Sequence, residues 1–170
     1  GVTFRLRAAD DPAGQAGACR GQEIALPAGR YAALLVLAAA VGDRRAVFRV
    51  DGRPCELPVQ DWQGFIGQWD RRVRERDASA PPAGAELEPG FVKAAPVAWF
   101  ARHRHAADGR DEPYAYAYAF AYAIALPGRA RALRLSDDPR VRVLAVTAVG
   151  EERALLPLWP AADGLPPGRP

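Results

Sequence analysis

The chain has 170 residues, of which 49% are hydrophobic and 25% charged, as is typical of one globular domain with a sizeable core. Its formal net charge of +3 comes from scattered arginines, and the one cluster, "DRRVRERD" at residues 70–77, is interleaved with acids, so we predict no nucleic-acid partner. The longest apolar run, residues 31–41, is shorter than the ~20 residues of a membrane-spanning helix, so we expect a soluble protein without a membrane partner.

The N-terminal stretch "GVTFRLR" alternates apolar and polar residues in the manner of a strand and does not resemble a signal peptide. The sequence contains no methionine. We therefore expect a piece cut from a longer protein.

Turn signals then recur along the chain and leave segments of strand length between them. Residues 31–41 are rich in Ala and Leu, which also suit a helix, but the strand-like "RAVFRVDG" follows at once, so we predict a buried strand. Two more strands, "RARALRL" and "VRVLAVTAV", come late in the chain. The pattern predicts an all-β, antiparallel β-sandwich that occupies residues 1–150, with a surface loop at 77–89 and an irregular, proline-rich tail at 151–170.

The strongest local pattern is "YAYAYAFAYAIAL" at residues 114–126, where aromatic or bulky residues alternate with alanine. Period-two alternation predicts a long strand with all the large side chains on one face. That face could fill the core against a closely packed alanine face, or it could form a platform for sugar rings. We favour the core for Phe120 and Tyr122, whereas Tyr114 and Tyr116 near the strand's start are candidates for ligand contact.

Both histidines of the chain lie just before this strand, in "RHRHAADGRDEP". His103 and His105 are two residues apart and share a face, but a transition-metal site needs a third ligand, which here would have to be a carboxylate. We expect no metal and predict instead a polar strand end with a turn formed by Asp108 and Gly109. Calcium at "DGRDE" is favoured somewhat over a transition metal, since carboxylate and carbonyl oxygens cluster there, but the spacing does not match an EF-hand loop. No phosphate loop or nucleophile elbow is present.

A second polar and aromatic stretch is "DWQGFIGQWD" at residues 61–70. Carboxylates and amides recognise sugar hydroxyls, and indole rings stack on the apolar side of a pyranose. The alternative is that both tryptophans belong to the core and the amides cap strand ends. The carbohydrate-contact candidates of the whole chain are Asp61, Trp62, Gln68, Trp69, Asp70, His103, His105, Glu112, Tyr114 and Tyr116.

Three blocks of the sequence resemble a known family. They are "CRGQEIALPAGRY", "VQDWQGFIGQWDRR" and "GFVKAAPVAWFARHRHAADGRDEPYAYAYAFAYAIALP", and they are followed by "LSDDPRVRVLAVT". Together they resemble the C-terminal β-domain region of bacterial α-mannosidases of glycoside hydrolase family 38, over roughly residues 19–149. The resemblance implies a fold like the galactose-binding jelly rolls.

The resemblance also implies a function. Family members are retaining, zinc-dependent α-mannosidases whose nucleophile and zinc ligands lie in an N-terminal catalytic domain, and none of those residues has a counterpart here. The chain is thus expected to be a non-catalytic accessory domain without a cofactor of its own. Its partners would be the remainder of a multi-domain glycosidase and mannose-containing glycans. The alternatives are an autonomous carbohydrate-binding module and a small metal-dependent enzyme built on His103 and His105.

Overall fold

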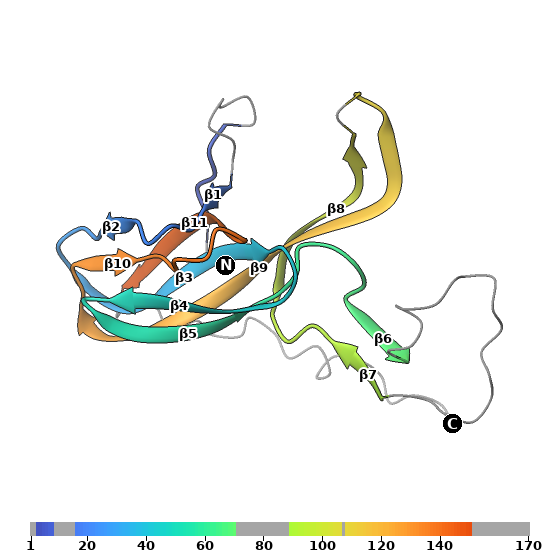
Figure 1. Cartoon of the computed structure of the whole chain (residues 1–170). Helices are drawn as coiled ribbons and strands as arrows, with labels where there is room; N and C mark the ends of the chain where they lie inside the picture. Colours follow the sequence, from blue (N-terminus) through green and yellow to red (C-terminus); the bar gives the residue numbers. More distant parts are fainter. Residues whose placement is uncertain (1–2, 9–15, 71–88, 107, 151–170) are drawn as a thin grey trace, which may run out of the picture.

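The computed structural model describes residues 3–8, 16–70, 89–106 and 108–150. These residues form antiparallel strands and no helix, which confirms the predicted all-β sandwich. Two sheets face each other and a two-stranded ribbon lies beside them (Figure 1). No helix in these ranges has the length and apolar character needed to cross a membrane. The predicted tail at 151–170 and most of the predicted loop at 77–89 lie outside the described residues, and a strand already begins at Pro89.

The larger sheet has five strands in the order β1-β11-β3-β9-β8. The smaller sheet has four strands in the order β2-β10-β4-β5, and the ribbon pairs β6 with β7. The strands are β1 (Gly17–Ala18), β2 (Glu23–Ala25), β3 (Arg30–Ala40), β4 (Arg44–Val50), β5 (Arg53–Val59), β6 (Gly67–Asp70), β7 (Pro89–Val92), β8 (Val97–His105), β9 (Asp111–Arg129), β10 (Ala132–Arg134) and β11 (Val141–Gly150).

The core lies between the two sheets and confirms the predicted role of the alternating segment. Phe120, Tyr122 and Ile124 of β9 are all buried, and they pack in one cluster with Phe48 of β4. The run at residues 31–41 is the strand β3, as predicted, and it lies between β9 and β11. Its unbroken apolar sequence fits this central position, because residues on both of its faces are buried.

The alanine face of β9 differs from the expectation of close packing. Ala119 is buried, but Ala123 and Ala125 on the same face are exposed. The large side chains point into the sandwich, so the alanines form part of its outer surface. Both cysteines, Cys19 and Cys55, are free thiols.

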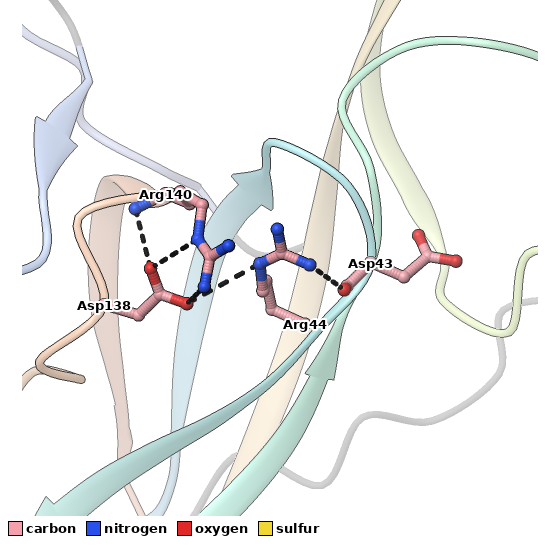
Figure 2. A network of polar contacts seen from close by, with 4 residues as sticks. All are labelled: Asp43, Arg44, Asp138 and Arg140. Atoms are coloured by element: carbon pink, nitrogen blue, oxygen red, sulfur yellow. Dashed lines mark hydrogen bonds and ion pairs between the residues drawn. The ribbon is translucent and has the colours of Figure 1, made fainter.

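Two turns of the sandwich are joined by charged side chains. Asp138, between β10 and β11, accepts hydrogen bonds from the backbone N–H and the Nε of Arg140 at 3.0 and 3.1 Å, and its Oδ2 lies 3.6 Å from Nε of Arg44 (Figure 2). Asp43, beside Arg44, accepts a hydrogen bond from the backbone N–H of Asp61 at 2.7 Å. The network therefore links the β10–β11 turn to the β3–β4 turn, and from there to the segment that follows β5.

Replacing Asp138 by Asn is expected to lower the free energy of unfolding at neutral pH by less than about 1 kcal/mol, since solvent screens the ion pairs that Asp138 makes at the surface. Hydrogen bonds from Arg140, and to a lesser extent the nearby charge of Arg44, lower the pKa of Asp138 below its ordinary 3.8. A lowered pKa stabilises the fold above the ordinary value, and this stabilisation is lost as the pH falls through the folded-state pKa.

Urea unfolding at pH 7 and at about pH 2 measures the effect. The difference between wild type and Asp138→Asn should disappear at the lower pH. The neighbouring Asp137 is exposed, so Asp137→Asn is the matched control and should leave stability unchanged at both pH values. Equal losses from the two substitutions at pH 7 would contradict the role of the network.

Candidate functional site

The segment after β5 is inserted into the larger sheet. Pairing of β3 with β9 ends at Ala38 and Phe120, and beyond this point the two strands diverge. Residues 60–63 fill the gap: the N–H of Trp62 donates to the carbonyl of Ala40 at 2.9 Å, and the carbonyl of Trp62 accepts from the N–H of Tyr118 at 2.7 Å. These bonds fix Trp62 between the two strands.

The only lysine of the chain holds this inserted segment from one side. Lys93 is 8% exposed, and its Nζ donates to the carbonyl oxygens of Asp61 and Gln63 at 2.7 and 3.1 Å. The same Nζ lies 5.7 Å from the ring centroid of Phe120, a cation–π distance. Lys93 thus ties the inserted segment to the core, a role that sequence reasoning missed. The sequence held one signal of this role, since Lys93 is the single lysine among 23 lysines and arginines.

An apolar hollow of about 330 Å³ opens on the outer, alanine side of the larger sheet. Small side chains create it, because alanines from β3 and β9 leave space above the sheet that larger residues would fill. Trp62 and Trp99 stand among them, and Trp99 is 52% exposed. The lining residues are Ala16, Ala39, Ala40, Val41, Trp62, Trp99, Ala117, Tyr118, Ala119, Arg142 and Leu144.

Polar groups lie next to Trp62. The guanidinium carbon of Arg104 is 5.3 Å from the centroid of the Trp62 ring, which places the cation over the indole. Arg104 also donates to Oε2 of Glu112 at 2.9 Å and lies 3.5 Å from Oε1 of Gln63. We call Gln63, Arg104 and Glu112 the polar rim.

The hairpin of β8 and β9 extends beyond the sandwich (Figure 1). We call this extension, formed by β8 and residues 111–118 of β9, the arm. Its turn has the predicted chemistry: the Asp108 carboxylate accepts from the N–H of Arg110 at 3.1 Å and from its Nε at 2.6 Å, and Gly109 has a φ of +80°. These hydrogen bonds lower the pKa of Asp108.

The structure separates the predicted carbohydrate-contact residues. Trp62 lines the hollow, and Glu112 belongs to the polar rim. His103, His105 and Tyr116 are exposed on the arm, whereas Asp61 is buried at 6% exposure and therefore does not lie on an open surface. The backbones of Gln68, Trp69 and Asp70 lie in β6 and that of Tyr114 lies in β9, but the side chains of these four are outside the described residues.

Comparison with known proteins identifies the sandwich. A search of curated proteins finds no match. The sequence model of one domain family, described as "AziU2-like beta-sandwich domain", matches residues 1–152. This range contains both sheets, the ribbon, the inserted segment and the arm. The chain therefore belongs to the AziU2-like beta-sandwich domain family.

Proposed function

We propose that the chain is a non-catalytic accessory domain that docks, through its arm, onto another domain or subunit of an enzyme. The observation that carries this proposal is the exposure of two consecutive aromatic residues of β8. Trp99 is 52% exposed and Phe100 is 57% exposed. Neighbouring residues of a strand point to opposite faces, so the arm presents aromatic surface on both sides.

Pairing with β9 defines these two faces. Trp99 is opposite Ala119 and extends the alanine face over the hollow, whereas Phe100 is opposite Tyr118 and extends the face that carries Tyr116. Val92 and Val97, at the approach to the arm and at its start, are exposed as well. A sugar platform needs one aromatic face, while an arm that exposes an aromatic residue on each face near its start suits insertion between surfaces of a partner protein.

The kind of enzyme is proposed from the sequence blocks that resemble family 38 α-mannosidases. By that proposal the partner is the catalytic domain of such a mannosidase, which supplies the zinc ion and the nucleophile. The chain itself then has no α-mannosidase activity.

Replacing both Trp99 and Phe100 by Ser is expected to weaken docking by at least about 30-fold, because a buried aromatic anchor contributes roughly 2 kcal/mol or more to an interface. The measurement is co-purification and calorimetric titration with a family 38 mannosidase catalytic domain from the source organism. Val47→Ser is the matched control, since Val47 is exposed on β4 of the other sheet.

Glycan contact is a second candidate function, and the polar rim favours it, because Arg104 lies over the indole ring of Trp62 and binds the carboxylate of Glu112. Titration with α-linked mannose oligosaccharides separates the two functions. Glycan binding that is lost in Glu112→Gln and kept in the Trp99 and Phe100 double variant would identify a carbohydrate-binding module. Absence of both glycan binding and mannosidase docking would contradict the mannosidase proposal.

A further inference from the structure

The outer end of the arm brings together three side chains whose ligand atoms are close enough to hold a metal ion. Ligand atoms of His103, His105 and Asp111 all lie within 4.8 Å of one another, and all three residues are exposed. Nδ1 of His105 is 2.6 Å from Oδ1 of Asp111, and the two imidazole rings have centroids 5.1 Å apart. A set of two imidazoles and one carboxylate is a common donor combination for divalent transition metals.

The backbone of the hairpin determines this arrangement. His103 and His105 are two residues apart on β8 and share a face, and His105 is paired directly with Asp111 across the hairpin. The turn between them is held by hydrogen bonds from Ala106 N–H to the Arg110 carbonyl at 2.8 Å and from Gly109 N–H to the Ala106 carbonyl at 2.9 Å. The carboxylate of Asp111 is therefore held close to both histidines before any ion arrives.

The other two acids at this end of the arm bind arginines. Asp108 accepts from Nε of Arg110 at 2.6 Å, and Glu112 accepts from a terminal nitrogen of Arg104 at 2.9 Å. Asp111 differs, because its carboxylate faces an imidazole. Its charge is thus placed where it can serve a cation that the histidines also bind.

We propose that His103, His105 and Asp111 bind one divalent transition-metal ion of the zinc type. Metal–ligand bonds of about 2.1 Å in a tetrahedral site place the donor atoms about 3.4 Å apart, so small rotations of these exposed side chains complete the site. Three protein ligands leave a coordination position open, which a carboxylate, hydroxyl or imidazole of a partner or ligand can occupy. The proposal departs from the metal-free expectation because the hairpin supplies the third ligand.

The test is calorimetric titration of the full chain with Zn²⁺, using protein that carries no polyhistidine tag. We expect one ion per chain with a micromolar Kd. Asp111→Asn should weaken binding by at least about tenfold, and His103→Ala combined with His105→Ala should abolish it. Asp108→Asn and Glu112→Gln are the matched controls and should change the Kd by less than about twofold, since their carboxylates bind arginines.

Cobalt provides an independent spectroscopic readout. Co²⁺ bound by the wild type should give visible d–d absorption bands that are absent from the double histidine variant, and circular dichroism should show that every variant keeps its strand content. Zinc binding that survives the double substitution would overturn the proposal. So would a wild type that binds no zinc, or equal losses from Asp111→Asn and Asp108→Asn. None of these measurements uses a mannoside or a partner protein, so they are independent of the proposed function.

Discussion

Phe120→Ala is expected to lower the free energy of unfolding by about 3–5 kcal/mol, which is a large part of the stability of a typical domain. Phe120 is fully buried and is one of the largest completely buried side chains. It lies near the centre of β9, where Ala38 of β3 and Val97 of β8 are its partners on either side. Truncation there leaves a cavity between two sheets that cannot close it without moving a central strand.

Urea unfolding of the full chain, followed by circular dichroism, measures this loss. Phe120→Leu retains most of the volume and should cost less than about half as much. Tyr116→Ala is the matched control, because Tyr116 lies on the same face of the same strand but is 36% exposed, so its loss should stay below about 1.5 kcal/mol. If the two alanine variants were equally stable, the assignment of Phe120 to the core would be wrong.

The contrast between Phe120 and Tyr116 also shows what sequence reasoning could predict. Alternation of large residues with alanine is a local property, and it correctly placed Phe120, Tyr122 and Ile124 on the core face. The strand β3 was predictable from its neighbours in sequence, since a continuous apolar run suits a strand covered on both faces and a turn and a second strand follow it at once. The burial of individual alanines on the other face of β9 was not predictable, because it depends on side chains from segments that are distant in the sequence.

The inserted segment explains why the hollow escaped prediction. Nothing in "QDWQGF" indicates that residues 60–63 would separate the ends of β3 and β9, since such pairing depends on where two other strands diverge. For the same reason the sequence predicts a sugar contact at Asp61, whereas its backbone bridges to β3 and its side chain is buried. Tertiary pairing decided these positions, and local propensity did not.

The arm was predictable in part: the sequence indicated its turn but not the position of Asp111. Asp108 and Gly109 predicted the turn correctly, since aspartate binds nearby backbone and glycine tolerates positive φ. The place of Asp111 depended on the register of the hairpin, because a shift of one residue would have turned its carboxylate to the opposite face from the histidines. The sequence offered several carboxylates as a third ligand for the two histidines, and the pairing of His105 with Asp111 shows which of them lies beside both.

Lys93→Met is expected to lower the free energy of unfolding by about 2–4 kcal/mol, because hydrogen bonds from a charged donor to a buried acceptor contribute roughly 1.5–3 kcal/mol each and are only partly additive. Methionine preserves the apolar stem of the side chain but removes the donor from the carbonyl oxygens of Asp61 and Gln63. The cation–π contact with Phe120 is lost as well. The inserted segment would then be held chiefly by its backbone bonds to β3 and β9.

Hydrogen exchange tests whether this loss is local to the site. The amide of Tyr118 donates to the carbonyl of Trp62, so it should exchange at least about tenfold faster in Lys93→Met, beyond any change at the amide of Phe48 in the smaller sheet. Arg104→Met is the matched control, since it also removes a cation close to Trp62. The side chain of Arg104 is 39% exposed, so this substitution should lower the free energy of unfolding by less than about 1 kcal/mol. Equal effects of the two substitutions on stability and on Tyr118 exchange would mean that Lys93 does not anchor the segment, and that the backbone bonds alone position Trp62 in the hollow.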